Sequence, residues 1–446
     1  MQTVETLVHA RWIVPVEPAD RVLENHALAI AHGRIVALLP SAEAASRFAA
    51  VEDIHLPRHV LIPGLINAHT HAAMALLRGL ADDLPLMQWL QDHIWPAEHR
   101  WVTADFVRDG AELAVAEMLR GGTTCFADMY FFPEVTAQVA RQAGMRAMLG
   151  LILFDFASAW GAGPEEYLAK GLDLRDQHKN DPLLGFVFAP HAPYTVSDPW
   201  LTKLRALADE LDLPVHIHVH ETAGEVEDSL AQHGKRPLAR LGDLGLVTPA
   251  LMAAHMTQLS DEEIAVAAEN GISVVHCPSS NLKLASGFCP VAKLIQAGVN
   301  VAIGTDGAAS NNTLDMLAEM RQAALLAKGV AGDPSAVPAA TALRMATLNG
   351  AKALGLDRDL GSLIPGKWAD ICAVDLDCPE TQPVHDVVST LVYAAGREQV
   401  SDVWVAGRRL LQERALPRTD LPGLLKRAAA WRQRIAAGDA ASVRSA

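Results

Sequence analysis

The sequence predicts an α/β protein: a parallel (β/α)8 TIM barrel beside a small β-sandwich built from both chain ends. Its 446 residues suit a barrel with an added module. Eight short apolar runs alternate with amphipathic stretches between residues 62 and 362, as in a closed parallel barrel. The first run is followed by His-x-His rather than the Gly-rich loop of a doubly wound fold.

The two terminal segments have short β-like runs. In residues 1–61, the apolar runs 27–31 and 35–38 flank a turn at His32-Gly33-Arg34 and predict a hairpin. In residues 363–415, strands are expected at 369–374, 387–394 and 403–410. Neither segment is long enough to bury a core alone, so we expect the two to pack together beside the barrel. Residues 416–446 are expected to form a C-terminal helix and tail.

The barrel region, residues 62–362, supplies eight expected strands. These are Val60–Ile66, Thr123–Asp128, Arg146–Leu153, Leu184–Ala189, Val215–Val219, Leu251–Ala254, Ser273–His276 and Val299–Gly304. Amphipathic stretches such as 103–120 and 261–270 are expected as helices between them.

Polar residues able to do chemistry end most of these strands. They are His69, His71, His191, His218, His220, Glu221, His255, His276 and Asp306. All strand C-termini of a barrel open at one face, where active sites lie. A chance scatter of 18 histidines would not concentrate at strand ends in this way. We therefore expect these side chains to meet at one barrel mouth.

Composition excludes several classes of protein. The net charge of −15 disfavours a nucleic-acid or anionic-membrane surface. No secretory leader pattern and no run of 18 apolar residues is present. The five cysteines are odd in number and scattered, as in a reducing compartment. We expect a cytoplasmic protein that acts on a small molecule, without nucleic-acid or membrane partners. The oligomeric state stays open, a homo-oligomer included.

His69 and His71 are the first candidate metal ligands. Side chains two residues apart share one face of a strand, so the two imidazoles can face one cation. The alternative is a His-rich turn or a solvated strand edge. His218 is favoured as the next ligand because Glu221 follows three residues later and can reach over the ligand sphere. His216 and His220 share that strand face and are expected to support the ligands or to pack.

Asp306 ends the eighth strand and is the candidate carboxylate ligand. It could instead cap the next helix, but Asn311, Asn312 and Thr313 can do that. His255 is either a core histidine or catalytic, and its strand-end position favours catalysis; the role of His276 stays open. Eight other histidines are expected at the surface or in packing: His9, His55, His59, His93, His99, His178, His233 and His385.

This donor set predicts a metal-dependent barrel. Three neutral imidazoles and one carboxylate suit Zn²⁺, with Fe²⁺ or Mn²⁺ as other candidates. Bound zinc can lower the pKa of a water to about 7. Hydrolysis then needs an acid that moves a proton to the leaving side, and Glu221 is placed for it.

The motifs resemble the amidohydrolase superfamily and, more narrowly, the 5′-methylthioadenosine/S-adenosylhomocysteine deaminases. The resemblance covers roughly residues 5–415. It rests on Gly64-Leu65-Ile66-Asn67-Ala68-His69-Thr70-His71, His218-Val219-His220-Glu221-Thr222, Ala254-His255, Gly304-Thr305-Asp306, Trp95-Pro96-Ala97-Glu98, Pro190-His191-Ala192-Pro193-Tyr194 and Leu363-Ile364-Pro365-Gly366-Lys367.

The resemblance implies one metal per chain, held by His69, His71, His218 and Asp306. Binuclear relatives carry a bridging lysine on the fourth strand, and Leu184–Ala189 has none. It also implies that Glu98 binds the ribose hydroxyls and that His191 contacts the sugar. Trp89 is a further candidate for the pocket wall.

The expected reaction is hydrolytic deamination of an adenine nucleoside to the inosine analogue and ammonia by a metal-bound hydroxide. Glu221 would donate a proton to ring N1, and Asp306 would pass the proton of the hydroxide towards ammonia, so both would contact the substrate. His255 would stabilise the developing charge. The alternatives are another amidohydrolase activity, such as guanine deaminase or triazine chlorohydrolase, or a metal-free binding scaffold.

The segment 154–174 bears on the 5′ group of the nucleoside. Relatives that accept S-adenosylhomocysteine can hold its carboxylate with arginines here, whereas this segment has only Lys170 as a cation. Its Phe154, Phe156 and Trp160 are expected to line an apolar pocket. Methylthioadenosine is therefore the expected preference, with adenosine and S-adenosylhomocysteine as further substrates. The sequence does not give the natural 5′ group or the metal loaded in the cell.

Overall fold

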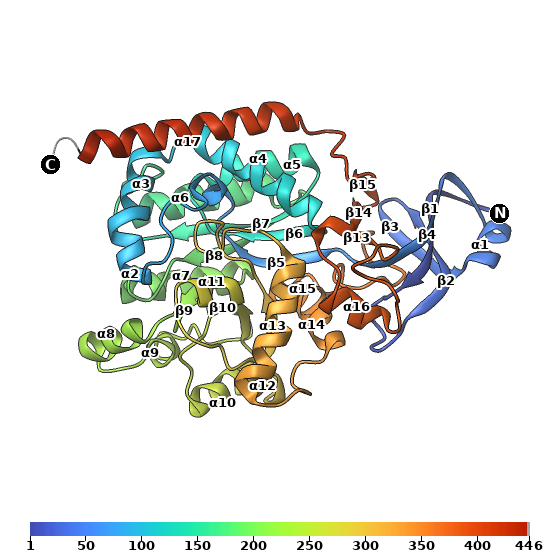
Figure 1. Ribbon diagram of the computed structural model, residues 1–446. Helices are drawn as coiled ribbons and strands as arrows, with labels where there is room; N and C mark the ends of the chain where they lie inside the picture. The colour runs from blue at the N-terminus through green and yellow to red at the C-terminus, as the bar shows by residue number, and fades with distance from the viewer. Residues whose placement is uncertain (444–446) are drawn as a thin grey trace.

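The computed structural model describes residues 1–443 and shows a barrel with a smaller sheet packed against one end (Figure 1). The barrel sheet has the strand order β12-β11-β10-β9-β8-β7-β6-β5, with every pair parallel. Its strands are β5 (Leu65–Thr70), β6 (Thr123–Asp128), β7 (Arg146–Leu153), β8 (Leu184–Pro190), β9 (Val215–Val219), β10 (Leu251–His255), β11 (Ser273–His276) and β12 (Asn300–Ile303). The predicted fold class is confirmed.

The first expected strand, Val60–Ile66, is wrong in extent. Residues up to Pro63 belong to β4 (Phe48–Pro63) of the smaller sheet, and β5 begins at Leu65. Gly64 marks the break. A Cβ at Gly64 would lie 2.1 Å from the Thr124 hydroxyl, so the chain passes from sheet to sheet in close contact with β6. An apolar run alone does not reveal this change of sheet.

The barrel nearly closes between β12 and β5. The amide of Asp306 donates to the carbonyl of His69 at 3.0 Å. A Cβ at Gly304 would lie 2.7 Å from Cβ of His69, so only glycine allows this approach. At the opposite end of the barrel, α15 (Leu348–Ala353) packs on β5, and its Gly350 lies against Ile66.

Helices follow the barrel strands around the outside. The segment after β5 is the longest and holds η1 (Ala72–Leu77), α2 (Leu86–Trp89), a π-helical turn η2 (Leu90–Ile94), α3 (Trp95–Trp101) and α4 (Ala104–Arg120). The others are α5 (Pro133–Ala143), α6 (Pro164–His178), α7 (Asp198–Leu211), α8 (Ala223–His233), α9 (Pro237–Asp243), α10 (Asp261–Glu269), α11 (Pro278–Lys283), α12 (Val291–Gln296), α13 (Met316–Ala331) and α14 (Ala339–Met345). The helices expected at 103–120 and 261–270 are confirmed as α4 and α10.

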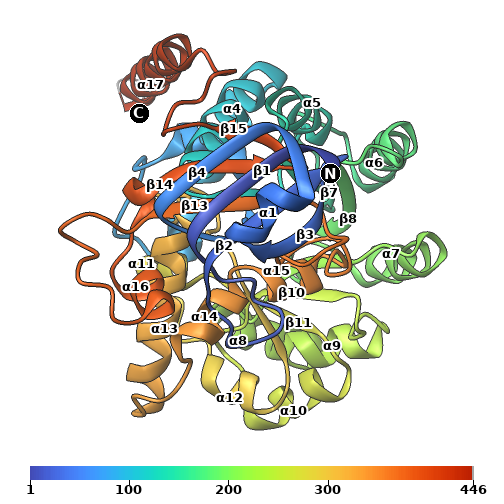
Figure 2. The same cartoon turned by 90° about the vertical axis from the view of Figure 1, so that its right-hand side faces the viewer.

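The smaller sheet joins both ends of the chain (Figure 2). Its order is β15-β14-β13-β4-β1-β2-β3. Besides β4 and the short helix α1 (Ser41–Arg47), it contains β1 (Gln2–Ile13), β2 (Leu23–Ala31), β3 (Arg34–Pro40), β13 (Ile371–Asp375), β14 (Val400–Val405) and β15 (Arg408–Leu411). The expected hairpin is confirmed as the antiparallel pair β2–β3.

The strand expected at 387–394 is wrong. These residues form the helix α16 (Val387–Tyr393). Asp386 caps it by accepting a hydrogen bond from the Ser389 amide at 2.7 Å. Val387 and Leu391 are buried four residues apart, on one helical face. A run rich in valine and leucine suits a strand or a buried helix, and the cap decides between them.

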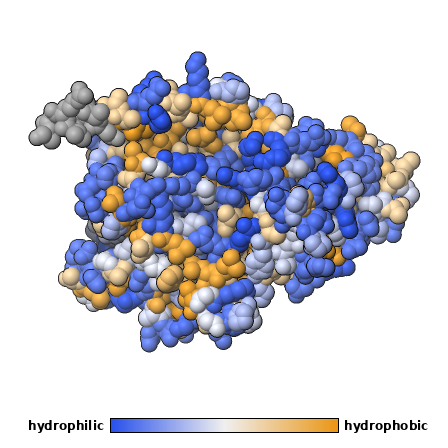
Figure 3. Space-filling model, in the orientation of Figure 1, coloured by the Kyte–Doolittle hydropathy of each residue, from blue (hydrophilic) through white to orange (hydrophobic). Residues whose placement is uncertain are grey.

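The last helix, α17 (Leu421–Val443), lies along α4 on the outside of the barrel (Figure 1). The indole N–H of Trp431 donates to Asp109 at 2.8 Å, and Arg427 pairs with the same carboxylate at 2.6 Å. Residues 444–446 of the expected tail lie outside the described residues. The face in Figure 3 is largely hydrophilic, with an apolar area along its upper edge. Within the described chain, no helix combines the length and hydropathy needed to cross a membrane.

We expect Gly64→Ala to destabilise the protein by about 1–3 kcal/mol, the usual cost of overpacking a tight site. The added methyl would overlap the buried side chain of Thr124. Gly329→Ala is the matched control, because a Cβ there has nothing within 4 Å and lies in α13. Thermal unfolding should show a lower midpoint for Gly64→Ala only. Equal midpoints would mean that β4 and β5 can separate at this point without cost.

Candidate metal centre and substrate pocket

Three histidines and one aspartate converge at the barrel mouth. His69 and His71 come from the end of β5, His218 from β9 and Asp306 from the residues after β12. The ligand atoms of the three histidines lie within 4.8 Å of one another. Nε2 of His69 and of His71 lie 3.3 and 3.2 Å from Oδ1 of Asp306. The structure thus brings together all four residues expected to hold a metal.

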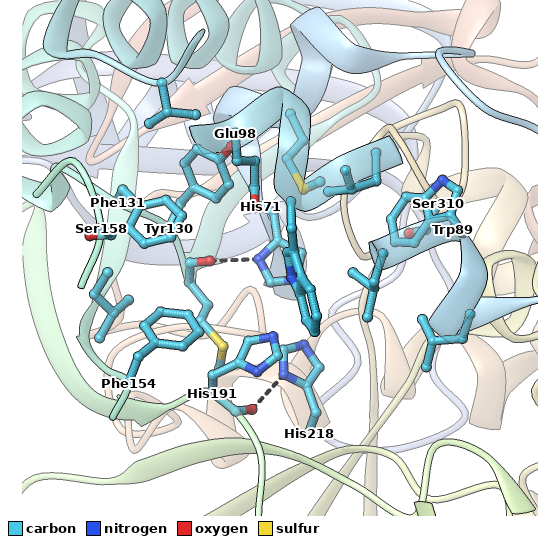
Figure 4. A pocket seen from close by; sticks show the side chains of 18 of the residues that line it. His71, Trp89, Glu98, Tyr130, Phe131, Phe154, Ser158, His191, His218 and Ser310 are labelled. Carbon is cyan, nitrogen blue, oxygen red and sulfur yellow. Dashed lines mark hydrogen bonds between the residues drawn. The ribbon is translucent and has the colours of Figure 1, made fainter. Parts of the chain in front are cut away.

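The other ring nitrogen of each histidine fixes its orientation. Nδ1 of His71 donates to the carbonyl of Met129 at 2.5 Å, and Nδ1 of His218 to the carbonyl of His191 at 2.6 Å (Figure 4). A carbonyl only accepts, so Nδ1 carries a proton and Nε2 faces the centre. Nδ1 of His69 is hydrogen-bonded to Nε2 of His216 at 3.0 Å, which leaves His69 Nε2 free in the same way.

Asp306 carries the negative charge of the centre. Its Oδ2 accepts from the hydroxyls of Ser280 at 2.6 Å and Ser310 at 2.9 Å, and its Oδ1 from the Gly307 amide at 2.7 Å. Burial opposes ionisation, but the nearby imidazoles of His69 and His71 outweigh it and hold the Asp306 pKa well below its usual value. The carboxylate is therefore ionised at neutral pH.

These donors fit a divalent ion. Nε2 of His69 is fully buried and has no hydrogen-bond partner among the described residues. Burial lowers the pKa of His69 to about 4, so its imidazole is neutral. Burial also opposes protonation of His71, but Asp306 raises its pKa to about 9. A proton on His71 thus balances the carboxylate, and a cation at this point would replace it.

Glu221 and His255 lie beside the four donors. Nε2 of His255 is 3.8 Å from Oε2 of Glu221, and Nδ1 of His255 is 2.8 Å from Oδ1 of Asn281. The backbone amide of Glu221 donates to Glu225 at 2.6 Å, which anchors the loop after β9. Burial raises the pKa of Glu221, so this carboxyl is more readily protonated than an exposed one.

The expectation that His216, His218 and His220 share one face is wrong for His220. The backbone of His220 is left-handed, with φ 54°, and the ring turns away from the centre. Its Nε2 accepts from the Leu238 amide at 3.1 Å. His216 instead supports His69, as described above. His276 is buried, lies in none of the donor groups, and has no hydrogen-bond partner for either nitrogen within the described chain.

The donors open into a pocket of about 400 Å³ (Figure 4). Trp89, Glu98 and His191 line it as expected, together with aromatic and aliphatic side chains. Glu98 lies next to Tyr130 in Figure 4, and burial raises its pKa to about 7. The ring of His191 stacks on Phe154 with 4.9 Å between centroids. The size and the apolar lining suit a ligand of nucleoside dimensions.

The segment after β7 lines one side of this pocket. Phe154 and Phe156 lie in the wall, but the expectation for Trp160 is wrong. Trp160 stacks on Tyr167 at 5.7 Å, and its indole N–H donates to Glu134, outside the pocket. Lys170 is paired with Glu166 at 2.6 Å. Among the described residues that line the pocket, none is lysine or arginine.

Several supporting residues were missed at the level of sequence: Ser280, Asn281, Ser310 and Glu225. The first two lie in α11, four and five residues after the end of β11, so a search extended beyond the strand end could have found them. Ser310 lies four residues after Asp306. Glu225 is the third residue after Thr222, the N-cap of α8, and this capping-box spacing is the signal that could have marked it as an acceptor of backbone amides.

A zinc-type centre at the C-terminal mouth of a parallel barrel, with a second sheet from both termini, defines a class of metal-dependent hydrolases. The chain belongs to the Amidohydrolase family, whose match covers residues 60–410. The resemblance found in the sequence motifs is confirmed.

Two relatives cover nearly the whole chain. A 5-methylthioadenosine/S-adenosylhomocysteine deaminase of Teredinibacter turnerae is 53% identical over 98% of both chains. The crystal structure of an adenosine deaminase from Xanthomonas campestris with bound zinc is 56% identical, with a TM-score of 0.97 over 98% of this chain and 99% of that one. An atrazine chlorohydrolase of Arthrobacter aurescens, complexed with zinc, shares the fold at a TM-score of 0.89 but is only 24% identical over 96% of this chain and 99% of its own.

We expect the purified protein to retain one tightly bound divalent ion per chain after transfer into metal-free buffer. His218→Ala removes a buried donor and should abolish this retention, as measured by elemental analysis of the folded protein. His99→Ala is the matched control, because His99 lines the pocket but belongs to none of the donor groups. Full retention by His218→Ala would show that His218 is not a ligand.

Proposed function

We propose that this chain is a zinc-dependent aminohydrolase that converts an adenine nucleoside to its inosine analogue and ammonia, with 5′-methylthioadenosine preferred. The observation that carries the proposal is the placement of Glu221 and His255 beside four convergent metal donors at the base of a nucleoside-sized pocket. The named activities of the two close relatives support the same substrate class.

In this proposal His69, His71, His218 and Asp306 hold the ion. Zinc bound there supplies Lewis-acid activation of water. The hydrogen bonds to Met129, His191 and His216 keep the imidazoles turned to the centre, and Ser280 and Ser310 keep Asp306 in place. The protein therefore provides a preorganised site that needs little rearrangement during the reaction.

The proton transfers use three side chains. Glu221, protonated in the complex, donates to ring N1 and so makes C6 more electrophilic. The proton that Glu221 donates is one of the two protons of the attacking water, and Asp306 accepts the other and passes it to the departing ammonia. His255 hydrogen-bonds the attacking oxygen, and Asn281 holds its other ring nitrogen. The raised pKa of Glu221 suits the first step, because an acid must be partly protonated near neutral pH.

Glu98 and His191 recognise the sugar. A carboxylate at Glu98 can accept hydrogen bonds from both the 2′ and the 3′ hydroxyl, and leaving it unpaired in a ligand-filled apolar pocket would be costly. Guanine deamination and triazine dechlorination need no ribose partner, so Glu98 favours a nucleoside over those alternatives. The likeness to the chlorohydrolase extends to the fold alone, at 24% identity.

We expect 5′-methylthioadenosine to exceed S-adenosylhomocysteine in kcat/KM by at least about tenfold, or about 1.4 kcal/mol. The pocket wall contains Phe154 and Phe156, and none of the described residues that line the pocket is lysine or arginine. A carboxylate on the 5′ group would therefore lose its water of hydration without gaining a cationic partner. The steady-state rate of deamination of each substrate can be measured from the loss of adenine absorbance and from the release of ammonia. Adenosine and 2′-deoxyadenosine complete the panel, and the deoxy compound should be poor because it lacks the 2′ hydroxyl that would donate a hydrogen bond to Glu98.

Two results would contradict these assignments. Equal or reversed efficiencies for the two 5′ groups would mean that a cation from elsewhere reaches the carboxylate. No ammonia from any nucleoside in the panel, with metal present, would overturn the proposed function itself.

Glu221→Gln should lower kcat by about 10²-fold or more, the usual scale of general acid–base catalysis. Glutamine keeps the shape but cannot relay protons. The metal content of the variant should remain at the wild-type value, since Glu221 lies beside the ligands and is not one of them. A loss of metal in Glu221→Gln would instead make Glu221 a ligand.

A further inference from the structure

A second group of metal-type donors lies outside the barrel, on the smaller sheet. His9 belongs to β1, and Asp53 and His55 belong to β4. The two strands are parallel neighbours, and His9 is directly opposite His55 in the register. Asp53 precedes His55 by two residues and therefore points to the same face of the sheet. The sequence placed both histidines among surface or packing residues, because neither ends a barrel strand.

This group shares with the barrel centre the placement of two imidazoles beside one carboxylate oxygen, although His9 and His55 are parallel, at 5°, whereas His69 and His71 are at 84°. Nε2 of His9 and Nε2 of His55 are each 3.3 Å from the same oxygen, Oδ1 of Asp53. In the barrel the corresponding distances from two imidazoles to Asp306 are 3.3 and 3.2 Å. The ligand atoms of His9, Asp53 and His55 all lie within 4.8 Å of one another.

An ordinary pair of hydrogen bonds explains this arrangement less well. Both distances exceed the usual N–H···O length of about 2.9 Å. The two rings are stacked nearly parallel, 4.4 Å apart with 5° between their planes, so protonation of both would bring like charges together.

We propose that His9, Asp53 and His55 form a second site for a divalent transition-metal ion of the zinc class, separate from the catalytic centre. Two imidazole nitrogens and one carboxylate oxygen are a donor set that zinc accepts, with the remaining position left to water. Water can reach it because the side chains of Asp53 and His55 are 52% and 66% exposed.

The ion would tie β1 to β4. The chain continues from β4 through Gly64 into β5, which ends in His69 and His71. A clamp on β4 therefore stabilises the strand that leads into the catalytic centre, without touching the pocket. A ligand that binds only the folded state raises the free energy of unfolding of the protein. The site would therefore stabilise the fold when zinc is available.

The test counts zinc on the full-length protein. The enzyme is first loaded and transferred to metal-free buffer so that only the barrel ion remains, and it is then dialysed against micromolar zinc. Wild type should take up one additional zinc per chain, with a rise in the thermal midpoint. His55→Ala should take up none and show no rise, while its deaminase kcat/KM stays at the wild-type value. His55 is exposed, so this variant should fold.

His32→Ala is the matched control. His32 lies in the turn between β2 and β3 of the same sheet, 3.7 Å from Glu5, and belongs to none of the donor groups found among the described residues. It should keep the additional zinc, whereas Asp53→Asn should weaken it at least tenfold. Uptake of no second ion by wild type, or equal uptake by wild type and His55→Ala, would overturn the proposal. Neither outcome would contradict the proposed catalytic site, because that site is tested separately by the deaminase kcat/KM.

Discussion

The position of the candidate metal donors depends on what the second nitrogen of each imidazole binds. The partners of His71, His218 and His69 are the carbonyl of Met129 after β6, the carbonyl of His191 after β8, and the ring of His216 on β9. Each of these imidazoles is thus oriented by a group from another strand. The centre exists because the barrel closes, and no short segment of the chain could form it alone.

The same mouth stores backbone strain. His220, His255, Met256 and Asp306 all have positive φ, between 50° and 73°. Such conformations cost non-glycine residues about 1–3 kcal/mol each and persist only where other contacts determine them. Here the Met256 amide donates to the carbonyl of Val219 at 3.1 Å, and the Asp306 amide to that of His69 at 3.0 Å. These left-handed residues turn His255 and Asp306 towards the pocket and His220 away from it, which the periodicity of a strand would not do.

The sequence could predict which residues lie at the site, but it could not predict how these left-handed residues turn their side chains. The strands and the residues at their ends follow from apolar runs and from the geometry of parallel barrels, and so the four donors could be found. The turn of His220 could not, because periodicity carries no φ values. The pairing of His69 with His216 joins residues 147 positions apart, and the displacement of Trp160 depends on Glu134 and Tyr167. The roles assigned to individual residues, and the domain limits at 61 and 362, remain predictions.

The smaller sheet takes part in this arrangement through Asp370. Its backbone carbonyl accepts from the amide of Gly64 at 2.9 Å, at the break between β4 and β5. Its side chain pairs with Arg146 of β7 at 3.1 Å, with both groups almost fully buried. Removing one partner from a buried pair costs about 3–5 kcal/mol, because the other charge is left uncompensated. Without the C-terminal segment, the barrel would keep Arg146 unpaired and lose the acceptor that fixes the start of β5. The strand that ends in His69 and His71 is therefore held from both ends of the chain, which gives a physical reason for building the second sheet from both termini.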